Sequence, residues 1–424
     1  MRMLYNAALL PVRAASVVFS VWPRSTPEAT LERDQRLARR LPAVPPGAIW
    51  IHGASVGEAR LVGALAREIK RRRPEQSLAA SSVTATGRVQ LPSPPVVDAA
   101  FFLPLDFPAV QRRAFDVIAP SMIVLVETEL WPNLLDEAER RRVPVVIVNG
   151  RLAPERLGRY RRLSGLYGPL LRGLHAIGAA GSDEAGRFVA LGVSDEAIRV
   201  IGNLKFDLPA PSENPADLRA RFGISADRPI VAAGSTANGE DRLVLDAFAA
   251  ARREVPDLLL LLAPRHPERF ASAVEDAERR GFVVSRASLG AAPEHLDVLL
   301  LDTIGDLAAL YALAGSAFVG GSLVPVGGHN LLEPIAAGVP VLYGPHTEHV
   351  TEIAAALDRS GAGLRVQDAA ALGRSFADLA LRPDERARRV ALGRRFVDAN
   401  RGALHRAADL VLDVLDRNRS DRPA

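Results

Sequence analysis

Short apolar runs alternate with amphipathic segments along most of the chain from residue 48 onward. This alternation is typical of β/α units, in which buried parallel strands are connected by helices. In the first half the expected strands are Ile49–His52, Leu78–Val83, Ala99–Leu103, Met122–Val126, Val145–Val148 and Ile177–Ala180. In the second half they are Ile230–Ala232, Leu258–Leu262, Val283–Val284, Val298–Leu301, Ala317–Val319 and Val341–Leu342. The pattern therefore predicts an α/β protein with two successive parallel sheets.

A polar, proline-containing stretch separates the two series. Residues 208–215 read LPAPSENP, which is typical of a linker between domains. We therefore expect two doubly wound, Rossmann-like domains, over residues 31–207 and 208–424. Residues 384–417 are predicted to form a long arginine-rich helix. Whether this last helix crosses back to the first domain is left open.

The first 30 residues are expected to form a separate, membrane-associated segment. Residues 3–22 are mostly apolar, but Pro11 kinks the segment, and Arg13 near its centre would cost about 2.5–3.5 kcal/mol in a bilayer. A helix lying in the membrane interface is therefore favoured over a spanning helix. A helix packed on the protein itself remains an alternative.

Composition removes several classes of function. The 424 residues include no cysteine, which excludes disulfides, thiol nucleophiles and cysteine-bound zinc. The net charge is +4 and the isoelectric point about 9.8, because nearly all cations are arginine. Lys70 and Lys205 are the only lysines, so Lys205, in the motif GNLKFD, is a candidate for a role that a guanidinium cannot fill.

The most informative stretch is 320–345, which reads GGSLVPVGGHNLLEPIAAGVPVLYGP. Two glycine pairs follow an expected strand, and His329-Asn330 stands where the N-cap of the next helix is expected. Glycines let a ligand approach the backbone, and a helix N-terminus favours anions, so this stretch predicts a phosphate site. Glu333 could accept hydrogen bonds from a ribose. The alternative is that the glycines serve only tight turns.

Two carboxylate-containing turns follow strands of the first series, where ligands bind in open α/β sheets. Glu58 lies in HGASVGEA near the start of a helix, so a helix-capping role and a catalytic role both remain open. Glu127 and Glu129 lie in ETELWPNLL directly after a strand. A solvated acidic turn is the alternative for this pair.

Other motifs favour nucleotide binding. GSTANGED offers Ser235 and Thr236 as donors to phosphate, and APRHPERF offers Arg265 and His266. Neither a Walker A motif nor G-x-G-x-x-G occurs, which removes the best signals for ATP hydrolysis and hydride transfer. His346 and His349 are close in sequence, but no convincing carboxylate triad joins them, so a surface turn is favoured over a metal site.

Seven motifs in one order resemble the bacterial 3-deoxy-D-manno-octulosonic acid (Kdo) transferases of lipopolysaccharide assembly. They are HGASVGEA, ETELWPNLL, NGRL, GNLKFD, GST, PRHPERF and GGSLVPVGGHNLLEP. The apolar N-terminus is similar to the membrane-anchoring helix of that family. The resemblance implies a GT-B fold, with an N-terminal acceptor-binding domain and a C-terminal domain for the CMP-sugar facing a central cleft.

The resemblance also implies an activity and its residues. The donor would be CMP-Kdo and the acceptor a lipid A precursor, with inverting, metal-independent transfer at the cytoplasmic face of the inner membrane. Glu58 would be the general base, and Glu127 and Lys205 would stabilise developing charge. The donor would contact Ser235, Arg265, His266, Gly305, Asp306, Leu307, Asn330, Leu331, Leu332 and Glu333. No cofactor, metal or nucleic acid would be involved.

The basic and apolar segment 159–173 is a candidate contact with anionic lipid, and the alternative is a helix with its leucines in the core. Two rival functions remain open at this point. One is another GT-B enzyme, such as a nucleotide-sugar epimerase or a transferase that uses UDP-sugars. The other is a non-catalytic protein that binds nucleic acid or anionic membrane through its arginines.

Overall fold

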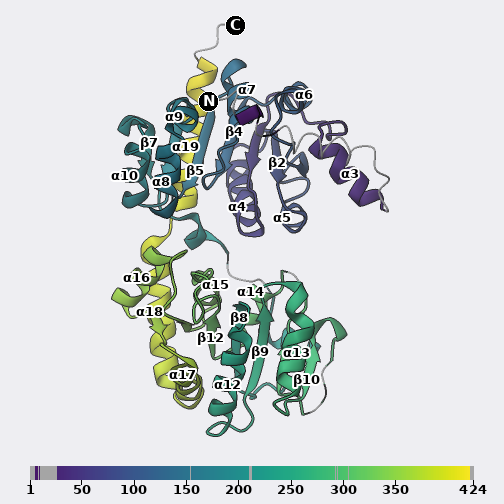
Figure 1. Ribbon diagram of the computed structural model, residues 1–424, viewed down its shortest axis with the longest axis vertical. Helices are drawn as coiled ribbons and strands as arrows, with labels where there is room; N and C mark the ends of the chain where they lie inside the picture. The colour runs from purple at the N-terminus through teal and green to yellow at the C-terminus, as the bar shows by residue number, and fades with distance from the viewer. Residues whose placement is uncertain are drawn as a thin grey trace. The chain divides into compact units, whose positions relative to one another are not determined.

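The computed structural model describes residues 5–7, 9, 26–152, 154–209, 213–291, 293, 295–303 and 305–420. The chain divides into two compact units. Unit 1 contains the chain up to Leu208 together with the chain from Arg401, and unit 2 contains Pro209–Asn400. Each unit holds a seven-stranded sheet whose paired strands are all parallel within the described residues (Figure 1). The prediction of two parallel α/β sheets is therefore confirmed.

The sheet of unit 1 has the strand order β3-β2-β1-β4-β5-β6-β7, which is the doubly wound order of Rossmann-like folds. Its strands are β1 (Ile49–His52), β2 (Leu78–Ser82), β3 (Ala99–Phe102), β4 (Met122–Val126), β5 (Val145–Gly150), β6 (Ala176–Ala179) and β7 (Ile198–Val200). Its α-helices are α3 (Pro27–Arg36), α4 (Val56–Arg72), α5 (Ala85–Gln90), α6 (Pro108–Ile118), α7 (Pro132–Arg140), α8 (Pro154–Arg162), α9 (Ser164–Arg172), α10 (Ser182–Val189) and α19 (Ala403–Ser420). Two short 3₁₀ turns, η1 (Asp195–Ala197) and η2 (Leu204–Asp207), lie near β7 in sequence.

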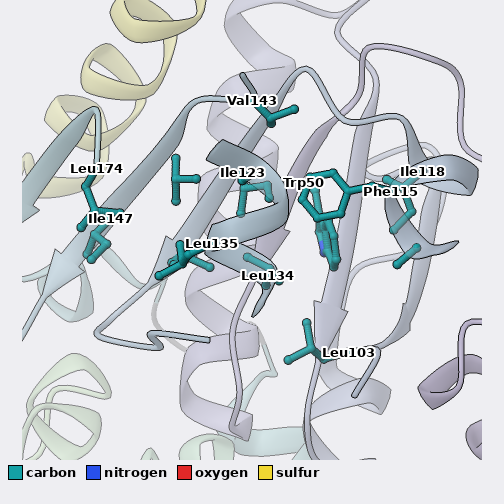
Figure 2. Packing of buried hydrophobic residues seen from close by; sticks show 14 of the residues in the cluster. Trp50, Leu103, Phe115, Ile118, Ile123, Leu134, Leu135, Val143, Ile147 and Leu174 are labelled. Carbon is teal, nitrogen blue, oxygen red and sulfur yellow. The ribbon is translucent and has the colours of Figure 1, made fainter. Parts of the chain in front are cut away.

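Strand alternation divides the core of unit 1 between the two faces of the sheet. Trp50 of β1 packs with one cluster, whereas Ile49 and Ile51, its neighbours in the strand, pack with the other. Figure 2 shows Trp50 beside Phe115 of α6, and their ring centroids are 6.0 Å apart in an edge-on arrangement. The opposite face is covered by α4 and by α19, which Figure 1 draws in yellow. The last helix therefore contributes to the core of unit 1.

The sheet of unit 2 has the order β10-β11-β9-β8-β12-β13-β14. Its strands are β8 (Ile230–Thr236), β9 (Leu259–Pro264), β10 (Val284–Arg286), β11 (Val298–Leu300), β12 (Ser316–Val319), β13 (Val341–Tyr343) and β14 (Gly363–Arg365). Its helices are α11 (Pro215–Arg221), α12 (Glu240–Arg252), α13 (Phe270–Glu278), α14 (Leu307–Tyr311), α15 (Leu332–Ala336), α16 (Thr351–Ser360), α17 (Ala369–Leu381) and α18 (Pro383–Asn400), with 3₁₀ turns η3 (Pro267–Arg269) and η4 (Ala287–Leu289). One buried cluster joins α12, α17 and the sheet through Phe248, Phe318 and Phe376.

The structure differs from the sequence prediction at two edge strands and in one helix. The prediction lacked β7, whose residues are mostly exposed, and β14, which begins with glycine. The long helix expected over residues 384–417 is two helices, α18 and α19. The break falls at Arg401-Gly402, where Gly402 has a φ of +93°, a left-handed conformation that glycine adopts without a steric penalty.

The predicted membrane segment, residues 3–22 of the N-terminal region 1–30, lies largely outside the described residues. Where it is described, it is joined to unit 1. The hydroxyl of Tyr5 donates to Asp106 at 2.9 Å, and the side-chain amide of Asn133 donates to Asn6 at 2.9 Å. Within the described part of the chain, none of the helices combines the length and apolar character that crossing a bilayer requires.

Candidate functional site

The first candidate residue, Glu58, lies in the turn that joins β1 to α4. Ser55 is the N-cap of α4, and its side-chain oxygen accepts the backbone N–H of Glu58 at 3.4 Å. The Glu58 carboxylate in turn accepts the N–H of Ala54 at 2.7 Å and the hydroxyl of Ser55 at 2.9 Å. This resembles a capping box, so the capping role of Glu58 is realised. Each carboxylate oxygen retains acceptor capacity, so the cap does not exclude a catalytic role.

The surroundings of Glu58 favour its protonated form. Burial raises the pKa of the Glu58 carboxyl, and the negative charge of Glu127 raises it further. The hydrogen bonds from Ala54 and Ser55 and the positive charge of Lys205 act in the opposite direction. Such competing effects are common at sites that exchange protons. The three predicted catalytic residues are therefore close enough to interact electrostatically.

Glu127 and Lys205 form a direct ion pair. The ammonium nitrogen of Lys205 lies 3.0 Å from Oε1 of Glu127, and the two side chains are only 19% and 23% exposed. Glu127 directly follows β4 and has a φ of +62°, an uncommon backbone conformation for a residue other than glycine. Lys205 lies in η2, the turn formed by GNLKFD. Residues from two distant motifs thus meet at the carboxyl end of β4.

Asn149, at the end of β5, connects both partners of this ion pair. It is fully buried and has a left-handed φ of +53°. Its Oδ1 accepts the backbone N–H of Leu204 at 3.0 Å, and its Nδ2 donates to Oε1 of Glu127 at 3.4 Å. Asn149 therefore fixes the backbone next to Lys205 while it contacts Glu127. Asn149 lies in the NGRL motif but was not predicted as a site residue; an asparagine between a buried strand and a glycine was the available signal.

The turn that carries Lys205 is also fixed at its other end. The carboxylate of Asp207 accepts the N–H groups of Gly402 and Leu404, each at 2.7 Å, at the start of α19. Asn203 caps the turn by accepting the N–H of Lys205 at 3.0 Å. The backbone around Lys205 is therefore held by β5 on one side and by α19 on the other.

The predicted donor residues of unit 2 lie beyond the carboxyl ends of its strands. Ser235 is close to the end of β8 and has a φ of +56°, and Arg265 follows β9, with its N–H bonded to the carbonyl of Thr236 at 3.0 Å. Asp306 precedes α14, and Gly305 before it has a φ of +106°. The buried hydroxyl of Tyr311 has its pKa raised, chiefly by burial and also by the charge of Glu333. Glu333 therefore lies within electrostatic range of α14.

The first glycine pair of the 320–345 stretch does not form a ligand site, and this part of the prediction is wrong. The carboxylate of Glu240, which is fully buried at the start of α12, accepts the N–H groups of Gly321, Ser322 and Leu323 at 2.6, 3.0 and 2.8 Å. It also accepts the N–H of Ala237 at 2.9 Å. A Cβ at Gly320 would lie 2.6 Å from Oε2 of Glu240, so glycine is needed for this close approach. The carboxylate of Glu240 thus occupies the backbone N–H groups beside the first glycine pair.

The second glycine pair leads to the predicted donor helix, which begins later than expected. The helix is α15, and Asn330 lies two positions before its first residue, Leu332, whose N–H it accepts at 3.2 Å. Asn330 is therefore not the N-cap. Leu331 and Leu332 are 0% and 3% exposed, so these two residues offer a donor almost no accessible surface in this structure.

Arg265, His266 and His349 lie close enough to His329 to interact with it electrostatically. Burial, followed by the charges of Arg265, His349 and His266, lowers the pKa of His329 to about 4. The ring of His349 lies against Gly327, whose carbonyl accepts the backbone N–H of His349 at 2.8 Å. His349 was predicted to lie in a surface turn, and its proximity to His329 was not predicted. Such a cluster favours an anion, and among the described residues no group of three His, Asp or Glu side chains is arranged to hold a metal.

The candidate lipid-contacting segment 159–173 is divided between α8 and α9. Leu166, Leu170 and Leu171 are buried, so these leucines lie in the core, as the alternative interpretation expected, and a contact with lipid would involve the arginines. The arginines of the segment are exposed: Arg159, Arg161, Arg162 and Arg172. What this segment presents to solvent is therefore mainly positive charge.

Comparisons with known proteins give consistent results. Residues 30–208 match the family model described as 3-deoxy-D-manno-octulosonic-acid transferase (kdotransferase). A 3-deoxy-D-manno-octulosonic acid transferase of Haemophilus influenzae is 36% identical over 395 residues, which cover 91% of this chain and 92% of that protein. The enzyme of the same description from Bordetella pertussis is 36% identical over 403 residues, with 90% of each chain covered.

A solved structure supports the fold over most of the chain. The UDP-GlcNAc 2-epimerase of Neisseria meningitidis has a TM-score of 0.61 and 12% sequence identity, covering 87% of this chain and 100% of that one. At this identity the likeness shows the fold alone.

Proposed function

Because this chain belongs to the 3-deoxy-D-manno-octulosonic acid (Kdo) transferase family of GT-B-like glycosyltransferases, we propose that it transfers Kdo from CMP-Kdo to a lipid A precursor. The observation that carries the proposal is the cluster of Glu58, Glu127 and Lys205. It combines a carboxyl of raised pKa with a partly buried ion pair at the ends of neighbouring strands. Such a cluster supports proton abstraction from a sugar hydroxyl.

In the proposed reaction an acceptor hydroxyl attacks the anomeric carbon of Kdo while the bond from that carbon to the phosphate oxygen of CMP breaks. The hydroxyl proton passes to the carboxylate of Glu58, and the bonding electrons leave with CMP. Attack opposite to the leaving group inverts the anomeric centre. Lys205, oriented by Glu127, stabilises charge that develops during the transfer. None of these steps requires a metal or a cofactor.

The donor would be held by unit 2. CMP-Kdo carries a phosphate and a sugar carboxylate, and Arg265 offers positive charge for such groups. The pKa of His329 is about 4, so its imidazole is neutral and would contribute a hydrogen bond, as would the rings of His266 and His349. Because Glu240 already occupies the first set of backbone N–H groups, these side chains would supply most of the anion recognition. Glu333 would contact the ribose.

We further propose that the enzyme works at the cytoplasmic face of the inner membrane. The exposed arginines of α8 and α9 would interact with anionic lipid headgroups. The N-terminal segment would provide an additional membrane contact. Removal of residues 3–22 is therefore expected to release the protein from membranes, and quantitative sedimentation of the truncated protein with membranes at high salt would contradict the anchor.

The test of the function is an in vitro transfer reaction. The full-length protein is incubated with a lipid A precursor and, in parallel, with CMP-Kdo or UDP-sugars, and the lipid products are identified by mass spectrometry. We expect Kdo-containing lipid only with CMP-Kdo. In single-turnover reactions Glu58→Gln should lower the rate by about 10²–10⁴-fold, whereas Glu129→Gln serves as the neighbouring carboxylate control.

Two results would reject parts of this proposal. Consumption of a UDP-sugar without transfer from CMP-Kdo would support the rival epimerase or UDP-sugar transferase function. Normal transfer by Glu58→Gln, with loss of transfer in Glu127→Gln or Glu129→Gln, would place the general base after β4 instead.

A further inference from the structure

A cavity of about 840 Å³ lies in unit 2, at the amino ends of the central strands. Its lining includes Ile230 and Ser316, the first residues of β8 and β12, and Pro340, which precedes β13. The predicted donor residues follow the carboxyl ends of β8, β9 and β12, so the cavity lies at the opposite edge of the same sheet. Its volume is in the range typical of small-molecule sites.

Two arginines of the lining are held in place by neutral groups. Arg219 of α11 donates to the carbonyls of Ser225 at 2.6 Å and Leu313 at 3.3 Å. Arg228, just before β8, donates to the carbonyls of Asp257 and Leu296. Burial lowers the pKa of both guanidinium groups, although the charge of Asp227 raises that of Arg219 and the charges of Asp297 and Asp257 raise that of Arg228. Both guanidinium groups are therefore held in place by carbonyl oxygens, and these hydrogen bonds do not use a carboxylate.

Two further arginines reach the cavity from one face of α18. Arg386 and Arg394 are eight residues apart, a spacing that places them on the same side of a helix. Arg388 and Arg389 each pair with Glu385 at 2.7 Å. Across the described ranges, neither Arg386 nor Arg394 has a carboxylate within 4.0 Å. On α18, Arg388 and Arg389 therefore form ion pairs, whereas Arg386 and Arg394, which line the cavity, have no carboxylate partner within the described residues.

One residue of the lining, Ser316, carries an unsatisfied polar atom. Ser316 is fully buried, and its hydroxyl has no hydrogen-bond partner within the part of the chain that the structure describes. Buried polar atoms are normally satisfied, and an oxygen of a bound ligand could supply the missing partner. Apolar groups complete the walls, among them Leu313 and Val390, and the acidic member of the lining is Asp227.

We propose that this cavity is a second anion site, which binds a compound carrying a phosphate or diphosphate group. Guanidinium groups match phosphate oxygens in geometry and keep their charge at all physiological pH values. Four of them outnumber the single acidic side chain of the lining. The phosphate could belong to a soluble phosphorylated compound or to a lipid headgroup, and binding here does not depend on the proposed transfer reaction.

The test uses the full-length protein saturated with CMP, so that the donor site is already filled. Pyrophosphate is then titrated by calorimetry. We expect one further equivalent to bind, and Arg386→Gln/Arg394→Gln to weaken this binding by about tenfold or more, because charge-assisted hydrogen bonds are removed. Arg388→Gln, on the same helix but outside the lining, is the matched control and should bind as the unmodified protein does. Arg394→Gln alone replaces the double variant if the latter does not fold.

A second arm distinguishes the source of the phosphate. Vesicles of phosphatidylglycerol and of phosphatidylcholine are compared in a flotation assay with the same variants. Binding of pyrophosphate indicates a soluble ligand, whereas arginine-dependent flotation with phosphatidylglycerol alone indicates a headgroup. Equal binding by the double variant and the unmodified protein would overturn the proposal, and so would the absence of binding in both arms.

Discussion

The replacement Glu240→Gln tests the role assigned to the internal carboxylate of unit 2. Oε2 of Glu240 accepts the N–H groups of Ala237 and Gly321, and Oε1 accepts those of Ser322 and Leu323. Glutamine has the same shape but only one acceptor oxygen, and its NH₂ group would face two of the four N–H donors. The change therefore removes charge and creates a donor-to-donor contact in a fully buried site.

The expected cost follows from the number of hydrogen bonds that the substitution removes. A hydrogen bond to a charged group contributes about 1.5–3 kcal/mol, so removing two of them costs about 3–6 kcal/mol. This is a large part of the roughly 5–15 kcal/mol that stabilises a typical domain. The loop over residues 320–323 should therefore open more often, and the affinity for CMP should fall because the adjoining residues 327–330 lose their support.

Hydrogen exchange measured by mass spectrometry reports on this loop directly. We expect faster exchange in peptides covering residues 320–323 of the Glu240→Gln variant, together with weaker CMP binding in calorimetry. Glu254→Gln removes the same charge from an exposed position just beyond α12 and is the control. If the two variants exchange and bind CMP equally, the carboxylate does not hold the loop and the reasoning is wrong.

Three further predictions concern unit 1. Glu58 acts as a base only when ionised and its pKa is raised, so the single-turnover rate should fall as the pH drops through that raised pKa. Glu127→Gln removes a negative charge beside Glu58, so the rate of this variant should begin to fall at a lower pH than the rate of the unmodified protein. An equal pH dependence of the two rates would refute the coupling between Glu58 and Glu127. Lys205→Arg should lower turnover by about 10–100-fold, since the larger, planar guanidinium would place its charge differently from the compact ammonium that now lies 3.0 Å from Glu127; near-normal turnover would reduce Lys205 to a plain cation. Asn149→Leu should destabilise unit 1 by about 1–3 kcal/mol in urea unfolding, because the buried N–H of Leu204 loses its acceptor, and an unchanged midpoint would contradict this.

The sequence was sufficient to predict the two sheets because buried parallel strands are continuous apolar runs. Leu259–Pro264 and Met122–Val126 are buried along their whole length, and both were recognised. Edge strands lack this signal. Residues Ile198–Val200 are exposed or partly exposed, so nothing in their pattern separates them from a loop. The break at Gly402 was missed because its immediate neighbours, Arg401 and Ala403, are good helix formers.

The candidate site shows where sequence reasoning is limited. Motif order brought Glu58, Glu127 and Lys205 together as candidates, but only the fold shows that Lys205 pairs with Glu127. Asn149 was missed because its role depends on a left-handed backbone and on Leu204, more than 50 residues away in the chain. Pairings of this kind depend on tertiary contacts that no local pattern encodes.

The two glycine pairs of the 320–345 stretch explain why one half of the phosphate prediction failed. A run of backbone N–H groups attracts any anion, so a side-chain carboxylate that lies beside these groups in the folded protein competes with a ligand. Glu240 lies about 80 residues before Gly321, so its arrival could not be inferred from the stretch itself. With those N–H groups satisfied, positive charge for an anionic donor has to come from side chains. Arg265 and His266 follow one strand, whereas His329 and His349 belong to two other loops of the same sheet edge. The glycines therefore allow the loop to fold around the carboxylate of Glu240. An anionic donor would instead be bound by side chains that this loop and its neighbours hold in position.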